Sequence, residues 1–363
     1  MGELRDLTER LVSIPSHDDE TAAGDAIASC LREETAADVT RDAAGNVVAW
    51  RNEDADGDSL AFVGHHDVVP PDESQTDDGD YVVYEDDGRL YGRGTADMKG
   101  AVAAMLLAFR DAEPDGPLAF ASFVGEEVGG EGARHAISEG FAPDYAVVGE
   151  GSTGYSEGGV LDVAVAHKGR RASTVTAAGE AAHASEVESG ENAVYRACDA
   201  VDVLRDLDAP AADVLGQHLA GSLAVTEIEG GTAWNVIPES CEVTVDERTV
   251  PGERAALERV EDVEGVSWTV DQDLPPMACD DAAFADSVLE AARTVQDGAG
   301  EHVAKPHATD AGWLADAGTT CLVCGPAEPG EAHTADESVS LDVLSRCRAV
   351  YRRAADGIPG GQS

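Results

Sequence analysis

Short apolar runs alternate with helical patterns along this chain, and this alternation limits its fold more than any other feature. The apolar runs occupy residues 47–50, 60–64, 118–124, 145–148 and 319–324, and are typical of buried strands. Helical patterns occupy residues 4–14, 21–35, 98–111 and 132–139. Strands that alternate with helices predict an α/β fold, with a central sheet and helices on both of its faces.

The pattern changes between residues 166 and 277. Short strands are predicted at residues 172–178, 222–229, 242–248 and 267–270, around two helical stretches at residues 193–207 and 253–260. This order is typical of a smaller α+β domain. We therefore predict one domain formed by residues 1–165 and 278–363, with the α+β domain of residues 166–277 inserted into it.

Residues of the kind that bind metals stand where the apolar runs end. His65 directly follows one run, Glu126 and Glu127 follow another, and Glu150 follows a third. Functional sites of α/β sheets collect at the carboxyl ends of strands. We therefore expect these side chains, which come from separate segments, to lie together.

Two further residues extend this set. Asp97 lies in the glycine-rich segment of residues 92–100, and His333 follows the last apolar run. A lone Glu-Glu pair is usually solvated, and an aspartate before an apolar helix is often only an N-cap, but the joint order favours a site. Imidazole and carboxylate suit zinc, cobalt or manganese, and a shared carboxylate can hold two ions. The sequence therefore predicts a two-metal hydrolytic enzyme.

The charge of the chain excludes some classes of partner. Asp and Glu number 72 against 24 Lys and Arg, for a formal net charge of −48, and only three residues are lysine. Such a surface repels nucleic acid and anionic membranes, so neither is expected as a partner. An acidic, lysine-poor surface is typical of adaptation to high salt, where screening weakens self-repulsion.

The expected location is the cytoplasm. No basic and apolar leader opens the sequence, and no apolar run approaches the length that spans a bilayer. Seven cysteines, spread over a long chain, fit a reducing compartment better than a disulfide framework. Cys321 and Cys324 have CxxC spacing but lie within a predicted strand, so we interpret them as core residues rather than as a metal or redox pair.

Five segments of the chain resemble motifs of the M20 family of metallopeptidases, the group of acetylornithine deacetylase, succinyl-diaminopimelate desuccinylase, aminoacylase and carboxypeptidase G2. The segments are residues 64–70 (GHHDVVP), 92–100 (GRGTADMKG), 125–127 (GEE), 149–150 (GE) and 332–337 (AHTADE). The resemblance covers essentially the whole chain. It implies a zinc-peptidase-like catalytic domain with a mixed central sheet, an inserted ferredoxin-like domain used for dimerisation or as a lid, and a homodimer.

The resemblance also implies a role for each metal-binding residue. His65, Asp97 and Glu150 would bind one divalent cation. Glu127 and His333 would bind a second cation together with Asp97, which would bridge the two. Zinc is the cation expected first, with cobalt or manganese as alternatives.

Two acidic residues would act beside these ligands. Glu126 would be the general base, which takes a proton from metal-activated water and later delivers it to the leaving amine. Asp67 would accept a hydrogen bond from His65 and fix its tautomer. His66 is expected to face away from the site, because side chains alternate along a strand.

Residues of the inserted domain match family positions that contact the substrate. His183 matches a histidine that reaches the active site of the partner subunit and stabilises the tetrahedral oxyanion, and Asn235 matches a residue of similar role. Arg248 matches an arginine that binds the substrate carboxylate, and Arg170 or Arg171 would supply a further cation. A turn position for His183 and a strand-face ion pair for Arg248 are the alternatives.

The sequence departs from the family pattern at two places. Val187 stands where the family usually has a proline, although Gly190 and Asn192 follow as expected. Residues 307–310 read His-Ala-Thr-Asp where relatives often carry Gly-Thr-Ser-Asp. The substrate contacts near the last predicted strand are therefore not carried over from the family.

The function that these residues predict is hydrolysis of the amide between a small acyl group and the nitrogen of an amino acid. The doubled arginine at residues 170–171 is similar to that of succinyl-diaminopimelate desuccinylases, and favours an N-succinyl substrate slightly over an N-acetyl one. A dipeptidase or carboxypeptidase would share every metal ligand and stays an alternative. A catalytically idle binding protein is another, against which the presence of Glu126 and all five ligands argues.

Overall fold

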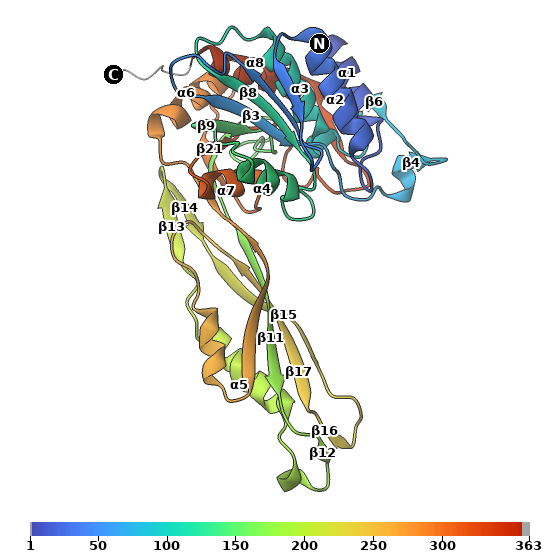
Figure 1. Cartoon of the computed structure of the whole chain (residues 1–363), viewed down its shortest axis with the longest axis vertical. Helices are drawn as coiled ribbons and strands as arrows, with labels where there is room; N and C mark the ends of the chain where they lie inside the picture. The colour runs from blue at the N-terminus through green and yellow to red at the C-terminus, as the bar shows by residue number, and fades with distance from the viewer. Residues whose placement is uncertain (1, 358–363) are drawn as a thin grey trace.

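Residues 2–357 are described by the computed structural model and form two bodies joined at one end (Figure 1). The upper body is built on a nine-stranded mixed sheet. Along the sheet the strands are β1 (Asp38–Arg41), β2 (Val47–Arg51), β8 (Leu118–Phe123), β3 (Leu60–His65), β9 (Tyr145–Val148), β21 (Thr320–Val323), β10 (Val163–His167) and β19 (Met277–Ala278), with β20 (His302–Lys305) paired to β10. The four central strands, from β8 to β21, are parallel to one another.

Alternate residues of the central strands pack into two different cores. Leu60 and Phe62 of β3 belong to the core on one face, whereas Ala61 and Val63 belong to the core on the other. The first face is covered by α1 (Gly2–Val12), α2 (Thr21–Glu34), α3 (Gly100–Asp111), α6 (Ala282–Arg293) and α8 (Leu341–Asp356), and the second by α4 (Glu131–Ser138) and α7 (Asp310–Asp316). Because both faces are buried, the central strands are continuous apolar runs without alternation.

The lower body has a sheet and a core of its own. Its strands are, in sheet order, β15 (Ser222–Gly230), β17 (Ser240–Arg248), β11 (Arg170–Ala178) and β18 (Val266–Leu274), all antiparallel. The helix α5 (Ala193–Arg205) packs on this sheet through Ala197 and Leu204. The hairpin of β13 (Ala211–Val214) and β14 (Gln217–Ala220) lies beside the upper body, while β12 (Ala182–His183) and β16 (Val236–Ile237) form the far tip (Figure 1).

The predicted fold class is confirmed, but one predicted helix is wrong. Residues 253–256 are irregular, and only a short 3-10 helix follows at Leu257–Asp262. The cause is a buried ion pair beneath this segment. Arg171 Nη2 donates to the carbonyl of Ala255 at 2.6 Å, and Glu247 Oε1 accepts from the Ala255 amide at 2.8 Å. A helix over residues 253–260 would use the carbonyl of Ala255 as an acceptor for a later amide, and here Arg171 binds that carbonyl.

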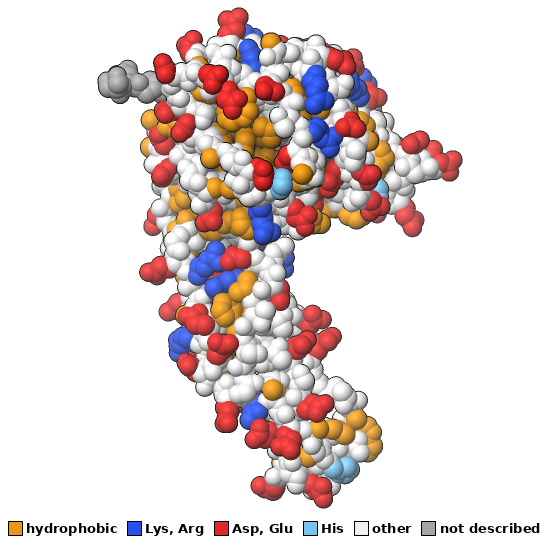
Figure 2. Space-filling view, in the orientation of Figure 1, with side chains coloured by type: hydrophobic (Ala, Val, Ile, Leu, Met, Phe, Trp, Pro, Cys, Tyr) orange, Lys and Arg blue, Asp and Glu red, His pale blue; other side chains and the backbone are white. Residues whose placement is uncertain are grey.

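Acidic side chains are spread over the surface of both bodies (Figure 2). Within residues 2–357, no helix combines the length and the apolar character needed to cross a membrane.

Candidate metal centre

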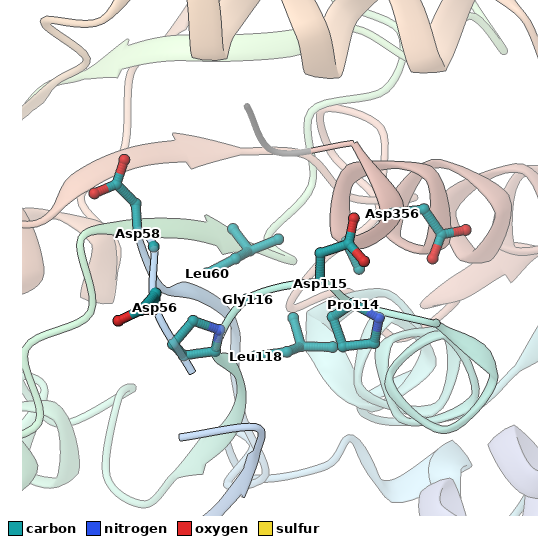
Figure 3. Close-up of a pocket in the computed structure, with 11 residues that line it drawn as sticks. Asp56, Asp58, Leu60, Pro114, Asp115, Gly116, Leu118 and Asp356 are labelled. Carbon is teal, nitrogen blue, oxygen red and sulfur yellow. The ribbon is translucent and has the colours of Figure 1, made fainter. Parts of the chain in front are cut away.

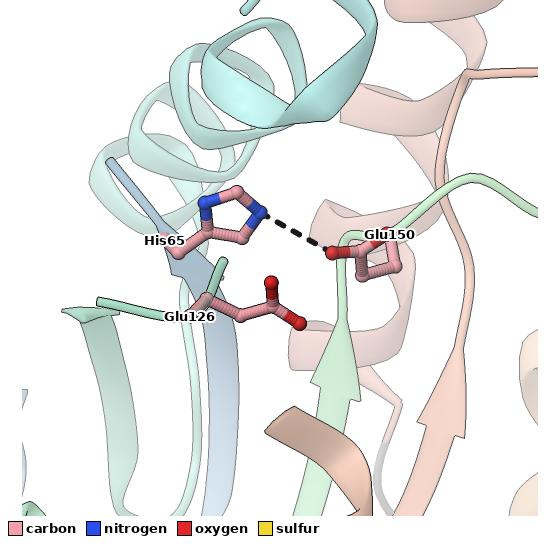
Figure 4. A group of neighbouring side chains, drawn as sticks. All are labelled: His65, Glu126 and Glu150. Atoms are coloured by element: carbon pink, nitrogen blue, oxygen red, sulfur yellow. Dashed lines mark ion pairs between the residues drawn. The ribbon is translucent and has the colours of Figure 1, made fainter. Parts of the chain in front are cut away.

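Parallel strands bring the first three candidate ligands together. The strands β3, β8 and β9 are parallel neighbours, so their carboxyl ends meet at one edge of the sheet. His65 ends β3, Glu126 lies just beyond β8, and Glu150 lies just beyond β9. Their side chains face one another (Figure 4), with ligand atoms of all three within 4.8 Å of one another. His65 Nε2 lies 3.3 Å from Glu150 Oε1.

Asp97 lies between two histidines. Its Oδ1 is 3.0 Å from His65 Nε2, and its Oδ2 is 3.1 Å from His333 Nε2. Glu127 Oε1 lies 3.0 Å from the same nitrogen of His333. The carboxylate of Asp97 therefore presents one oxygen to each imidazole, and a carboxylate placed in this way can be shared by two cations.

Asp67 contacts both His65 and the turn that carries Glu127. Its backbone carbonyl accepts a hydrogen bond from His65 Nδ1 at 3.1 Å, its Oδ1 lies 3.2 Å from the same nitrogen, and its Oδ2 accepts a hydrogen bond from the amide of Glu127 at 3.0 Å. The imidazole of His65 is thereby oriented with Nε2 toward the centre. The same carboxylate also fixes the turn that carries Glu127.

His333 comes from the segment after β21 and forms the open side of the centre. Its φ is 62°, in the left-handed region, where histidine is more frequent than most other residues with a β-carbon. Its side chain is 49% exposed, whereas that of His65 is 1% exposed. One side of the centre is therefore deeply buried, and the other is accessible from a cavity.

Glu337 ties the turn that carries Asp97 to the rest of the domain, a role that the sequence analysis did not predict. Its Oε1 accepts hydrogen bonds from the amides of Gly94 at 2.8 Å, Ala96 at 3.0 Å and Asp97 at 3.2 Å. Its Oε2 forms an ion pair with Arg93, and both side chains are buried. Gly94 has a φ of 85°, and a β-carbon there would meet a neighbouring side chain at 2.8 Å, so the turn requires glycine. The signal in the sequence was the position of Glu337 inside the motif of residues 332–337.

The electrostatics of the centre reflect its crowded carboxylates. Burial raises the pKa of Glu126 well above its ordinary value; His65 opposes this rise and Glu150 adds to it. Burial alone would raise the pKa of Asp97, but hydrogen bonds from His333 and His65 outweigh it and lower the pKa. Hydrogen bonds to Asp97 and Glu127 raise the pKa of His333 to about 10. The carboxylates of this centre therefore raise the pKa of His333, and the two imidazoles lower that of Asp97.

The donors present fit two divalent cations. Carboxylates and imidazoles converge without any thiol, a set that suits zinc, cobalt and manganese. The ligand atoms of His65, Asp97 and Glu127 also lie within 4.8 Å of one another. Within residues 2–357, His, Cys, Asp and Glu side chains converge in this way only here.

A second cavity, of about 130 Å³, lies at the opposite edge of the sheet (Figure 3). It lies beside the first residues of β3 and β8. Its acidic lining residues are Asp56, Asp58, Asp115 and Asp356. These carboxylates are not among the convergent ligand groups of the described residues, so we do not interpret this cavity as a metal site.

Two predictions about further residues agree with the structure. His66 is buried and faces away from the centre, with Nδ1 at 2.9 Å from Ser122 Oγ. Burial lowers the pKa of His66 to about 3, so its ring is neutral. Cys321 and Cys324 are buried in the core, as predicted for core residues.

His183 and Asn235 lie at the far tip of the lower body, away from the centre of their own chain (Figure 1). The amide of Ala184 donates to the carbonyl of Asn235 at 2.9 Å, which holds the two segments together. His183 is exposed, and its Nδ1 lies 2.7 Å from Ser185 Oγ. The structure therefore does not bring these two residues to the metal centre within one chain.

The predicted substrate-binding arginines lie in the lower body. Arg170 and Arg248 share the carboxylate of Asp246, through Nε atoms at 2.7 Å and 2.8 Å, and both are partly exposed. Arg171 is instead buried, with Nε 2.6 Å from Glu247 Oε2 and its guanidinium over a tryptophan ring. Because its donors are used inside the domain, we withdraw Arg171 from the residues expected to bind substrate.

Lys305 is another residue whose importance the sequence analysis missed. Its Nζ lies 3.0 Å from Glu150 Oε2, and the side chain is 8% exposed. The only signal in the sequence was compositional, because lysine occurs at three positions in the whole chain.

Comparison with known sequences agrees with the geometry. Residues 61–357 match the family described as Peptidase family M20/M25/M40. The chain is 32% identical over 342 residues to an acetylornithine deacetylase of Myxococcus xanthus, covering 87% of this chain and 85% of the relative. It is 29% identical over 370 residues to a Mycobacterium tuberculosis protein named as a succinyl-diaminopimelate desuccinylase, covering 98% of this chain and 99% of the relative.

Solved structures share the fold over nearly the whole chain. Aminopeptidase PepT from Bacillus cereus superposes with a TM-score of 0.78 at 19% identity and covers 98% of each chain. The YXEP protein of Bacillus subtilis, described as a dinuclear metal binding peptidase, superposes with a TM-score of 0.73 at 18% identity, covering 98% of this chain and 97% of the other. The protein is therefore a metal-dependent hydrolase that acts on amides, and it belongs to peptidase family M20/M25/M40.

Proposed function

We propose that the protein is a two-metal amidohydrolase that removes the acyl group from an N-acylated amino acid. The observation that carries this proposal is the position of Asp97, whose two oxygens face His65 and His333 at 3.0 Å and 3.1 Å. The names of two relatives, a deacetylase at 32% identity and a desuccinylase at 29%, support an N-acyl amino acid as the substrate.

The proposed ligands divide into two sets. His65 and Glu150 hold one cation with Asp97. Glu127 and His333 hold the other with Asp97. When bound, two such cations polarise the carbonyl of the amide and make water more acidic. Zinc is our first choice, because structures of its sites use these nitrogen and oxygen ligands, and cobalt or manganese would accept the same set.

Glu126 is the residue that we assign to proton transfer. Among residues 2–357, no side chain forms a hydrogen bond or ion pair with its carboxylate, which lines the cavity of the centre. The raised pKa of Glu126 suits a group that must first accept a proton from water and then donate it to the leaving nitrogen. Asp67 keeps His65 and the neighbouring turn in place during both steps.

The test is a substrate panel in molar salt with metal-loaded protein. N-succinyl and N-acetyl amino acids are expected to be hydrolysed, and turnover should be lost with a chelator and regained when zinc is added back. Hydrolysis of dipeptides alone would contradict the deacylase assignment. If the folded protein bound no transition metal and kept its turnover in chelator, the two-metal centre would be excluded.

A homodimer is also part of the proposal. The strand β15 is an edge of the lower sheet, where unpaired backbone groups are available to another chain. Exposed apolar side chains lie on the same body, among them Ile228, Tyr195 and Trp234, the last of them 97% exposed. Apolar side chains gather at the far end of this body (Figure 2). A second copy that covers this surface would also carry His183 toward the centre of the first.

Mixing two inactive variants tests whether His183 acts across the dimer. We expect His183→Ala to lower kcat about 10²–10³-fold, as loss of an oxyanion donor does. A His183→Ala chain mixed with a Glu126→Gln chain should regain about a quarter of wild-type activity, because half of randomly assorted dimers contain one intact site. No recovery after co-refolding at molar salt would show that His183 acts within its own chain or not at all.

We also propose a cytoplasmic location. All seven cysteines are free, and six of them are buried. Thiols persist in reducing compartments, whereas an oxidising one favours disulfides.

A further inference from the structure

A buried lysine borders the proposed metal centre. Lys305 ends β20, which runs parallel to β10 and therefore brings its last side chain toward the edge where the ligands gather. Its Nζ is 3.0 Å from Glu150 Oε2, whereas His65 contacts the other oxygen of that carboxylate. Lys305 and Glu150 both line a cavity of about 440 Å³ that also contains Glu126 and His333.

The ammonium group of Lys305 has donors to spare. A lysine carries three N–H donors. Within residues 2–357, the carboxylate of Glu150 is the one acceptor within hydrogen-bond distance of Nζ. Two donors therefore remain for a group that enters the cavity.

The charge of the cavity favours an anion at this position. Five carboxylates line the cavity, and four of them, those of Asp97, Glu126, Glu127 and Glu150, belong to the proposed centre, where two divalent cations would offset their charge. The positive charge of Lys305 would then have no full partner, because Glu150 is shared with a cation. A buried charge is costly unless it is paired, so a carboxylate of the substrate would complete this arrangement.

The cations that we assign to the substrate come from different bodies of the molecule. Arg170 and Arg248 belong to the lower sheet, where the carboxylate of the amino acid is expected. Lys305 belongs to the upper sheet, and Tyr155 and Ala327 line the same cavity. A substrate that engages both ends carries one carboxylate on its amino acid and another on its acyl group.

We propose that Lys305 binds a carboxylate on the acyl group of the substrate and thereby selects N-succinyl-type over N-acetyl-type amides. This inference rests on the proposed deacylase function. Charge-assisted hydrogen bonds from an ammonium to a carboxylate are among the strong hydrogen bonds of proteins. A neutral acetyl group would gain nothing comparable from Lys305.

Kinetics of Lys305→Met on N-succinyl and N-acetyl derivatives of one amino acid test the proposal. We expect kcat/KM for the succinyl substrate to fall about 10- to 100-fold, mainly through KM, as loss of a hydrogen bond to a charged group implies. The value for the acetyl substrate should change less than about threefold. Lys305→Arg keeps the charge and should keep the succinyl preference, and Lys168→Met is the control for loss of a lysine elsewhere. The metal content should match the wild type.

Three outcomes would overturn the assignment. An equal loss on both substrates, or a loss of bound metal, would mean that Lys305 only positions Glu150. Unchanged kinetics on both substrates would mean that Lys305 neither binds the acyl carboxylate nor positions Glu150. If the wild type hydrolyses neither substrate, the deacylase function fails. Calorimetry of the metal-loaded protein with succinate and with propionate then still tests whether Lys305 binds a carboxylate. A preference for succinate that Lys305→Met abolishes supports the proposal, and equal binding of the two acids overturns it.

Discussion

Replacing Glu126 with glutamine is expected to lower kcat by about 10²–10⁴-fold, the usual contribution of a general base. Glutamine has nearly the same shape but cannot accept and return a proton. Because no side chain among residues 2–357 bonds the Glu126 carboxylate, the change should leave the fold intact. Metal analysis of the dialysed variant should therefore show the wild-type content.

The adjacent residue provides a matched control for this experiment. Glu127 Oε1 contacts His333 Nε2 at 3.0 Å, so Glu127→Gln should weaken metal binding as well as turnover. The two variants make the same chemical change at adjacent positions. Unchanged turnover in Glu126→Gln would rule out its role as the base, and loss of metal from it would reassign it as a ligand.

Replacing Glu337 with glutamine is expected to lower the free energy of unfolding by about 3–5 kcal/mol, the usual cost of removing one partner of a buried ion pair. The amide can still accept hydrogen bonds from Gly94, Ala96 and Asp97, but it leaves the buried guanidinium of Arg93 without a counter-charge. Proteins are stable by about 5–15 kcal/mol, so this loss is a large part of the whole. Denaturant unfolding in chelator and molar salt measures it apart from metal binding.

The same substitution should also weaken metal binding, because Glu337 holds the turn that carries Asp97. Outer-shell partners of metal ligands typically contribute about 10- to 100-fold in affinity. Glu331→Gln is the control, since Glu331 pairs with Arg89 in the same segment but at a partly exposed position. Glu331→Gln should lower the free energy of unfolding by about 1 kcal/mol or less. A similar loss in both variants would contradict a special role for the buried pair.

The predicted strands agree well with the structure because their signal is local. The run of residues 60–64 is apolar at every position, as is typical of a short strand that is buried on both faces of a sheet. Placing His65 and Glu150 at strand ends followed from the same pattern. The pairing of Asp97 with His333 did not follow from this pattern, and was predicted only from the resemblance to a family.

Where local patterns and tertiary contacts compete, the contacts decide. Residues 253–260 have helical spacing, yet Arg171 and Glu247 bind the backbone of Ala255, and residues 253–256 are irregular. The doubled arginine looked like one feature, but alternation along β11 buries Arg171 and leaves Arg170 partly exposed.

The amino-acid sequence by itself determined the α/β class, the strands and the residue types that gather at their ends, because apolar periodicity and strand ends are properties of contiguous residues. Only the tertiary structure decided that Glu337 anchors the turn of Asp97, that Lys305 touches Glu150, and that His183 lies far from the centre of its own chain. Contacts of this kind join residues that are far apart along the chain. Their existence depends on how whole elements pack, and no local pattern encodes that packing.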